Sequence, residues 1–319
     1  MDCPLIDCHT HIGVDPAFYL RGHFPYAQDY RALADQARRN GISRLVTFPF
    51  VAYFGQEGLA VPAPWNERDF SVPYAFENRR MLEEIFELNA DLASIALPFA
   101  IVDPARRQEE QAKVLRSLHE RFPIRGIKIQ PTMIEAPIRS LLDGGRVLVN
   151  LAAEWNIPML IHSSIAPADI WSQASDILDV AEARPDVRFC LAHSCRFHRA
   201  SLERLGRLPN TWFDCSAHVI HCHAAVAGMD IVAVPEERLD TDYSRPEIVM
   251  KALYDFLPDR MMWGSDAPFY SYAGTHDDST LRLFSSYERE VTALELLTER
   301  EKTAICHENT LQFLGVRDV

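Results

Sequence analysis

The sequence predicts an α/β protein folded as a single-domain (β/α)₈ barrel, the TIM-barrel architecture, with long loops at the C-terminal face. Three observations predict this fold. Eight short apolar runs alternate with amphipathic helical runs, as in parallel strands joined by helical crossovers. No linker rich in Gly, Ser or Pro divides the chain, so we expect one domain over residues 1–319. Polar residues also interrupt the apolar runs near their C-terminal ends, where such barrels carry their chemistry.

The expected strands are short apolar runs, and most of them are continuous rather than alternating. Continuous apolar runs are typical of strands that are covered on both faces. Eight runs favour a closed barrel, whereas five or six would have favoured an open doubly wound sheet. They are Leu5–His11, Ile42–Phe50, Ala93–Val102, Ile124–Pro131, Pro158–Ser164, Val187–Ser194, Thr211–Ala217 and Arg260–Pro268.

The expected helices repeat apolar residues at helical spacing. In the first of them Tyr30, Leu33 and Ala37 share one face, and Gly41 follows as a stop. The helices are Gln28–Asn40, Glu77–Leu92, Ala105–Phe122, Val147–Trp155, Asp169–Ala183, Arg199–Leu208 and Pro246–Phe256, with two more in Ser286–Leu314. Three long insertions each follow a strand, so we expect them to form lids or specificity walls. They are Gly13–Ala27, Ala52–Tyr74 and Ala217–Arg245.

The composition limits the partners and the location. The 45 acidic and 32 basic side chains give a net charge of −13, so we expect neither nucleic acid nor a membrane as a partner. The longest apolar stretch, Ile95–Val102, is too short to span a bilayer. The seven cysteines form no C-x-x-C pair, and no basic start or apolar signal core follows Met1. These features predict a cytoplasmic protein with reduced thiols.

The candidate site residues lie at the ends of the expected strands. His9 and His11 are two residues apart on the first strand, so both should point into the barrel while Cys8 faces away. A lone imidazole, ammonium or carboxylate in such a place costs several kcal/mol unless it is paired or bound to metal. Imidazoles with a carboxylate suit Zn²⁺, and also Fe²⁺, Mn²⁺ or Co²⁺. The later strands contribute Lys128, His162, His193 and Asp266.

This ordered set of motifs resembles the amidohydrolase superfamily. It is most similar to the amidohydrolase-related (amidohydrolase 2) branch, which contains metal-dependent hydrolases, lactonases and non-oxidative decarboxylases. The resemblance runs from Asp7-x-His9-x-His11 to Trp263-Gly264-Ser265-Asp266, and the segment Asn309–Gly315 also resembles the branch. It implies a divalent metal, first of all Zn²⁺, as one or two ions. The implied metal ligands are His9, His11, His162, His193 and Asp266.

The resemblance also implies catalytic roles for Asp266, His193 and Lys128. Asp266 would take the proton of a water and later return it to the leaving group. His193 would polarise the substrate or bind a second ion. For Lys128 three roles remain open: a carboxylated bridge between two metals, a cationic contact to the substrate, and a structural ion pair.

Two departures from the branch bear on the substrate. His193 is followed by Ser194-Cys195-Arg196 where the branch often has a glycine-rich stretch, and Ile129 stands where it often has a histidine. The first departure places Arg196 near the expected pocket, where it or Arg21 can pair with a substrate carboxylate.

Further polar residues lie close to the expected site. His218, His221 and His223 can form an extra metal site, a pocket wall or an ordinary polar loop. Asp7 is expected to hold a histidine or a strand end rather than a metal. Weaker candidates for substrate contact in the rim loops are His23, Tyr270, Tyr272 and His276.

The function expected from these features is that of a metal-dependent hydrolase acting on a small amide, lactone or ester that can carry a carboxylate. The alternative is a metal-dependent non-oxidative decarboxylase (carboxy-lyase) on the same barrel. A third interpretation, a barrel that binds a metabolite without turnover, is disfavoured by the complete set of candidate ligands. A homodimer is expected only because dimers are common.

Overall fold

The computed structural model describes residues 4–53, 70–274 and 282–317, and it contains the predicted barrel. Within these residues eight parallel strands follow one another in the order β10-β9-β8-β7-β6-β5-β4-β1. Backbone bonds from Cys8 N to Trp263 O (3.1 Å) and from Asp266 N to His9 O (2.8 Å) join the first strand to the last. The strands are β1 (Leu5–Val14), β4 (Ile42–Pro49), β5 (Ala96–Ile101), β6 (Gly126–Ile129), β7 (Met159–Ile161), β8 (Phe189–Leu191), β9 (Thr211–Asp214) and β10 (Met261–Met262).

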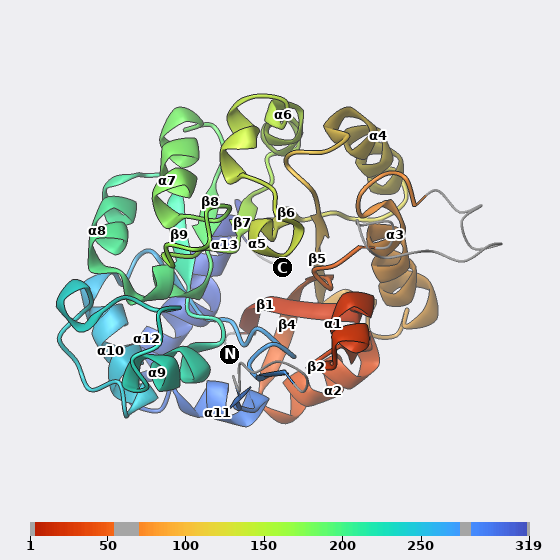
Figure 1. Cartoon of the computed structure of the whole chain (residues 1–319). Coiled ribbons are helices and arrows are strands. Elements are labelled where there is room, and N and C mark those ends of the chain that lie inside the picture. The colour runs from red at the N-terminus through yellow and green to blue at the C-terminus, as the bar shows by residue number, and fades with distance from the viewer. Residues whose placement is uncertain (1–3, 54–69, 275–281, 318–319) are drawn as a thin grey trace.

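The helices that connect the strands surround the barrel (Figure 1). In α2 (Tyr30–Arg39) the Asp29 carboxylate caps the first turn by accepting from Ala32 N at 2.8 Å, and the predicted apolar face is buried. The other connecting helices are α3 (Ala75–Glu83), α4 (Gln108–His119), α6 (Arg146–Trp155), α7 (Ala174–Ala183), α8 (Arg199–Arg207) and α10 (Pro246–Phe256). Their apolar faces and the outward side chains of the strands form the largest buried cluster.

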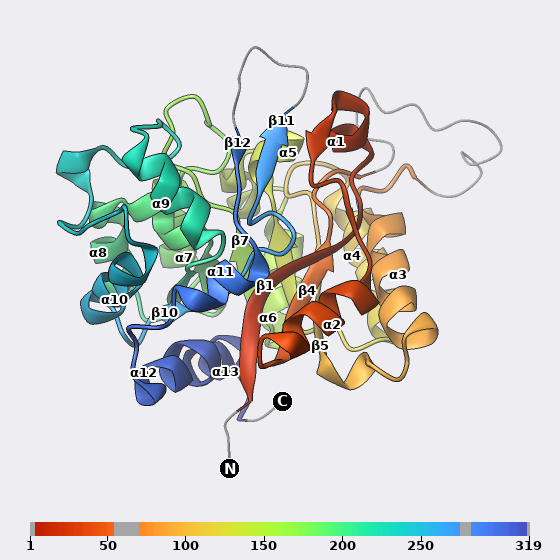
Figure 2. The same cartoon turned by 90° about the horizontal axis from the view of Figure 1, so that it is seen from below.

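The inside of the barrel is filled by a second apolar cluster that supports the site from below. It contains Phe48, Phe99 and Leu160 from neighbouring strands. The last helix, α13 (Asn309–Leu314), packs Phe313 against Phe99 and Trp212 and closes the end of the barrel near the start of β1 (Figure 2). Ligands can therefore enter the barrel at its opposite end, where the strands finish.

The first strand departs from simple alternation. Its pairing with β4 shifts register between Asp7 and Thr10. As a result Cys8 packs in the interior cluster, while His9 and His11 still line the cavity above it. The prediction that both histidines point inward is confirmed, but the prediction that Cys8 faces away was wrong. An extra residue at a β-bulge changes which side chains share a face, and the sequence does not reveal it.

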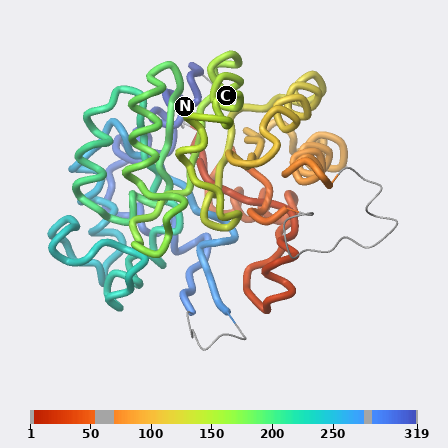
Figure 3. The backbone as a smooth tube through the Cα atoms, turned by 45° about the horizontal axis from the view of Figure 1, so that its top comes forward, coloured from red at the N-terminus to blue at the C-terminus, as the bar shows by residue number. Residues whose placement is uncertain are grey.

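The predicted insertions lie on the rim at the strand ends. The segment after β1 forms α1 (Pro16–Arg21), β2 (His23–Phe24) and β3 (Ala27–Gln28). A small sheet joins β2 to β11 (Tyr272–Gly274) and β12 (Arg282–Leu283), and the last two extend from the body (Figure 3). The segment after β9 forms α9 (His218–Val226) rather than the expected loop. Most of Ala52–Tyr74 lies outside the described residues.

The C-terminal end of the molecule differs from the expectation. The C-terminal segment contains α11 (Tyr287–Thr292), α12 (Glu299–Thr303), a π-helical turn and α13, so it is more broken than the two helices expected. No helix of the described residues has the length and apolar character needed to cross a bilayer.

A buried carboxyl group connects α9 to α11. Ala217 precedes α9 and has no side chain that can cap the helix, and a carboxyl oxygen of Glu290 on α11 accepts from Val219 N at 3.3 Å. The Ser285 hydroxyl donates to the other Glu290 oxygen at 2.8 Å. Burial outweighs these bonds and raises the pKa of Glu290 from 4.5 to about 8.

This shift predicts that the stability of the protein depends on pH. Between 4.5 and about 8 the folded chain keeps a proton on Glu290 that the unfolded chain has lost, so the free energy of unfolding should fall as pH rises. The shift corresponds to at most about 5 kcal/mol. Glu290→Gln should remove this fall, and the exposed Glu295→Gln should keep it. Urea unfolding across the range measures the difference, and equal slopes in all three proteins would contradict the assignment.

Candidate active site

The strand ends enclose a cavity of about 360 Å³ at the open end of the barrel. Its apolar walls include Phe18, Val51, Ile220 and Phe269. The structure brings all six predicted catalytic and metal-binding residues into its lining. They are His9, His11, Lys128, His162, His193 and Asp266.

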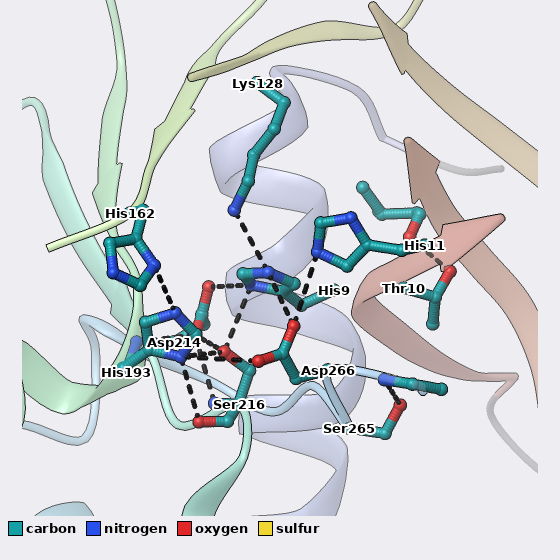
Figure 4. Close-up of polar contacts among 12 residues, drawn as sticks. His9, Thr10, His11, Lys128, His162, His193, Asp214, Ser216, Ser265 and Asp266 are labelled. Carbon is teal, nitrogen blue, oxygen red and sulfur yellow. Dashed lines mark hydrogen bonds and ion pairs between the residues drawn. The ribbon is translucent and has the colours of Figure 1, made fainter. Parts of the chain in front are cut away.

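The carboxylate of Asp266 is the centre of the cluster (Figure 4). His9 Nε2 lies 3.2 Å and His11 Nε2 lies 3.4 Å from the same oxygen, Asp266 Oδ1. His193 Nδ1 lies 3.8 Å from Asp266 Oδ2. Burial opposes ionisation of Asp266, but the surrounding rings of His9, His11 and His193 hold its pKa well below the usual range. Asp266 is therefore an ionised carboxylate inside the protein.

The Nδ1 atoms of His9 and His11, which face away from Asp266, each lie against a hydrogen-bond acceptor. His9 Nδ1 lies 2.9 Å from Asp214 Oδ2, and His11 Nδ1 donates to the carbonyl oxygen of Pro49 at 2.9 Å. Each ring therefore carries its proton on Nδ1 and turns Nε2 toward Asp266. Burial lowers the pKa of His11 to about 4, which keeps that ring neutral. This outer support is typical of histidines that bind metals.

The geometry gives a physical test of whether a cation fits. With both rings protonated on Nδ1, two Nε2 lone pairs and a carboxylate oxygen face one another, and a positive charge beside them stabilises this arrangement, as the Lys128 ammonium 3.0 Å from His9 Nε2 or a bound cation would supply. Burial and Lys128 lower the pKa of His9, but Asp214 and Asp266 outweigh them and raise it, so this position favours added positive charge. Ligand atoms of His9, His193 and Asp266 lie within 4.8 Å of one another. The donor set fits a divalent metal.

The fifth predicted ligand, His162, has a different environment. Its Nδ1 lies 2.9 Å from His193 Nε2, and its Nε2 lies 3.0 Å from Arg196 Nη2. Burial and the Arg196 charge lower the pKa of both His162 and His193 well below 6.5, so both rings are neutral. His162 thus lies beside the cluster with both ring nitrogens engaged.

Lys128 reaches the same cluster from β6. Its Nζ lies 3.0 Å from His9 Nε2 and 4.7 Å from the centre of the Phe48 ring. Burial lowers its pKa from 10.5 to about 8, and the nearby carboxylates of Asp266 and Asp214 limit the shift. The amine is close enough to the cavity to contact a substrate. The three roles left open by the sequence remain predictions.

Sequence reasoning missed Asp214. It ends β9, is fully buried, and accepts from the backbone nitrogens of His193 and Ser216 at 3.0 Å as well as contacting His9. Burial opposes its ionisation, but His9 and these bonds keep its pKa below the usual value. The signal was present, because a carboxylate follows the apolar Trp212 and Phe213 at the end of the seventh strand, as at the other strands.

The segment after β8 forms an unusual left-handed turn. Residues His193 to Phe197 all have φ between 48° and 64°. Non-glycine residues enter this region at a cost of roughly 1–2 kcal/mol each, which explains why a glycine-rich stretch would suit this place. Here the turn is held by bonds to His193 N and from Ala233 N to Arg196 O at 3.0 Å. It directs the Arg196 side chain into the cavity lining.

The remaining candidates have mixed outcomes. Asp7 holds a strand end as expected, because it accepts from Ser265 N at 2.9 Å and from the Tyr287 hydroxyl at 2.8 Å. Arg21 is exposed on α1, whereas Arg196 lines the cavity.

The three histidines of α9 do not converge. His218 donates to Pro246 O at 2.8 Å, His221 lines the cavity beside Arg196, and His223 is half-buried. Tyr272 also lines the cavity, while Tyr270 accepts from Gln36. His276 lies outside the described residues.

The left-handed turn yields a prediction about stability. The buried Ser194 has φ 51°, and its hydroxyl has no partner within the described chain. Ser194→Gly removes both the strain and the unpaired hydroxyl, so the free energy of unfolding should rise by about 1 kcal/mol. Ser194→Ala removes only the hydroxyl and should gain less. Thermal or urea unfolding of the three proteins is the test, and a glycine variant less stable than the alanine variant would rule out the strain.

Several solved structures resemble this chain in fold. The chain resembles the crystal structure of dihydroorotase from Campylobacter jejuni (16% identity, TM-score 0.56), covering 99% of this chain and 84% of the other. It also resembles 2,6-dihydroxybenzoate decarboxylase (12%, 0.57, 99% of both chains) and D-hydantoinase (12%, 0.57, 97% and 70%). At these identities the likeness shows the TIM-barrel fold. No curated protein matches the sequence.

The sequence also matches a family model. The model described as amidohydrolase covers residues 6–316, from the second residue of β1 to the residues just after α13. The match therefore includes every strand of the barrel and every residue of the cluster around Asp266. The chain belongs to the amidohydrolase family of metal-dependent enzymes, as the resemblance of its motifs indicated.

Proposed function

We propose that this protein is a metal-dependent hydrolase that acts on a small amide, lactone or ester. The observation that supports this proposal is the approach of His9 Nε2 and His11 Nε2 to one oxygen of the ionised Asp266. That arrangement faces a cavity large enough for a small molecule. Zn²⁺ is the first choice because neutral imidazoles and a carboxylate are its common ligands in catalytic sites.

The metal and the protein would divide the chemistry. A bound divalent ion would lower the pKa of water from about 15.7 to about 7 and polarise a carbonyl group. Asp266 is ionised and lies at the cavity, so its carboxylate can take a proton from the attacking water and return it to the leaving group. Lys128 lines the cavity and its ammonium could hold the substrate oxygen on which negative charge develops, whereas the role of His193, polarising the substrate or binding a second ion, stays a prediction from the sequence.

Two cations in the cavity lining, beside the carboxylates of Asp266 and Asp169, could pair with an acidic substrate. Lys128 and Arg196 both line the cavity, and burial lowers the pKa of Arg196 only to about 10, so the guanidinium stays charged at neutral pH. The apolar side chains of Phe18, Val51 and Phe269 also line the cavity and offer it an apolar wall. A small substrate with an apolar body and one carboxylate matches this lining.

Removal of the Asp266 charge tests its role. Asp266→Asn should retain metal but lose turnover on a panel of lactones, esters and amides by a factor of about 10² to 10⁴. Asp169 also lines the cavity, but its carboxylate is occupied by Thr132 and Ser172, so Asp169→Asn should have a much smaller effect. Metal content and kcat are the measurements. Near-normal kcat in Asp266→Asn would exclude it as the base.

The alternative is a non-oxidative decarboxylase on the same barrel. Lys128 and Arg196 favour it, because a cation is needed to bind the carboxylate of an acidic substrate. Asp266 also favours it, because its carboxylate can exchange a proton with a ring carbon of the substrate.

Isotope labelling distinguishes the two reactions. A hydrolase should place ¹⁸O from labelled water in a product carboxylate, as the proposal expects, since water is the nucleophile. Release of carbon dioxide from aromatic or dienoic acids without that label would favour the lyase instead. Mass spectrometry of the products measures both outcomes.

Several properties stay predictions from the sequence. These are the identity of the metal, the number of ions, a cytoplasmic location and a homodimer. Metal analysis of chain purified with ample metal also tests the interpretation as an inert binding barrel. Stoichiometric metal supports the enzyme, whereas little metal and no activity on the substrate panel would support the inert barrel.

A further inference from the structure

Two polar side chains of the cavity lining have hydrogen-bond donors that the mechanism above does not use. Gln130 follows Lys128 by two residues at the end of β6, and Ser164 follows His162 by two residues beyond β7. Residues two apart on an extended chain share a face, and all four of these side chains line the cavity. Gln130 and Ser164 are both more than nine-tenths buried, with exposed fractions of 7% and 6%.

The orientation of the Gln130 carboxamide is fixed by a backbone group. Met133 N donates to Gln130 Oε1 at 3.3 Å. A backbone N–H can bond to the amide oxygen but not to the amide nitrogen, so this contact assigns Nε2 to the other branch of the group. Nε2 has no acceptor in the part of the chain that the structure describes. Its hydrogens are therefore available to a molecule in the cavity.

Ser164 presents a second donor from the neighbouring strand. Its backbone is held on both sides, because its N donates to Ser172 O and its carbonyl oxygen accepts from Ala174 N, each at 2.9 Å. Its hydroxyl oxygen accepts from Ala166 N at 3.2 Å, while the hydroxyl hydrogen has no acceptor within the described residues. Since β6 and β7 are paired in parallel, Gln130 and Ser164 follow adjacent strands at the same end of the barrel.

These two donors carry no charge and lie nearer the mouth of the cavity than the ammonium of Lys128. A strand advances about 3.3 Å per residue, so the Gln130 backbone is roughly two such steps beyond that of Lys128. The carboxylate of Asp169 lies close to Ser164, because Ser172 bonds to both of them, through its hydroxyl at 2.7 Å and its carbonyl oxygen at 2.9 Å. A second anion at this place would meet a negative charge without a positive one to balance it.

We propose that Gln130 and Ser164 form a subsite for a neutral oxygen of the substrate, separate from both its carboxylate and the group that reacts. The oxygen belongs to a ketone, amide, ester or ether, which accepts from Gln130 Nε2 and from the Ser164 hydroxyl. The inference rests on the proposed function, since it needs an acidic substrate in this cavity. It narrows the substrate class to acids whose apolar body carries a second, uncharged oxygen acceptor.

The donors should act by discriminating between substrates. A ligand without an acceptor at this place displaces solvent and leaves buried donors unpaired, which is more costly than the bond itself is favourable. We therefore expect a preference of about tenfold for a ligand with the acceptor over a ligand of the same shape without it.

The experiment compares matched benzoates by calorimetry in the full chain, both loaded with Zn²⁺ and freed of metal. The pair is acetylbenzoate and isopropenylbenzoate, substituted at position 3 or 4, because these differ only in an oxygen that is replaced by CH₂. At one of the two positions acetylbenzoate should bind about tenfold more tightly, with or without Zn²⁺. Isophthalate and terephthalate, which have a second carboxylate in place of the acetyl group, should bind more weakly than the acetyl compounds.

Variants assign the preference to the two residues. Gln130→Leu should abolish most of it while isopropenylbenzoate binds as before, and Ser164→Ala should lower it about threefold. Gln130→Glu keeps the oxygen that Met133 N needs, and it should reverse the preference toward (aminomethyl)benzoate. The exposed Gln312→Glu adds the same charge away from the cavity and should change nothing. A merely structural role of Gln130 would weaken both members of the pair equally.

The possible failures are distinguishable. Equal affinities of acetyl and isopropenyl compounds at both positions, or a preference that survives Gln130→Leu, would overturn the subsite. A preference seen only with Zn²⁺ would mean that the oxygen binds the metal, and tightest binding of a dicarboxylate would mean that the second acceptor is charged. Either result contradicts the proposal. If no benzoate binds more tightly than benzamide, the acidic substrate of the proposed function is itself wrong.

Discussion

The closure of the barrel between β1 and β10 is the constraint on which the site depends. These strands come from opposite ends of the sequence, and their backbone bonds bring His9 and Asp266 into one cluster. The approach is so close that a Cβ atom at Gly264 would lie 2.7 Å from His9 Cβ, which accounts for the glycine. Asp7 adds a third connection through Ser265 N. A buried carboxylate thus reinforces the seam beside the proposed metal.

The two buried carboxylates of the site, Asp266 and Asp214, have different contacts and different roles. Asp266 faces the cavity and meets the Nε2 atoms of His9 and His11. Asp214 lies behind it and fixes the far side of His9 together with the backbone of His193. Asp214 orients the ring of His9. Asp266 is available for chemistry because its contacts are histidine rings that could bind a metal rather than backbone donors. The same residue type therefore serves two purposes according to what surrounds it.

Much of this arrangement was predictable from the sequence. All eight strands were found as short apolar runs, most of them continuous, and the six site residues were found because each breaks or ends such a run. Cys8 was misplaced because alternation does not reveal a register shift. Asp214 was missed because the expected seventh strand, Thr211–Ala217, extends beyond it, whereas β9 ends at Asp214. The left-handed turn at His193–Phe197 was not predictable, since Ser, Cys and Arg have no preference for that conformation.

The packing of α13 inside the base of the barrel has a consequence for how the molecule is made. Phe313 touches Phe99 and Trp212, so the floor beneath the cavity is completed by a segment that is synthesised after all eight strands. Nascent chains that have produced most of the helices still expose the lower rim of the sheet to water. A chain that lacks α13 would therefore expose the apolar interior cluster at the base of the barrel to water.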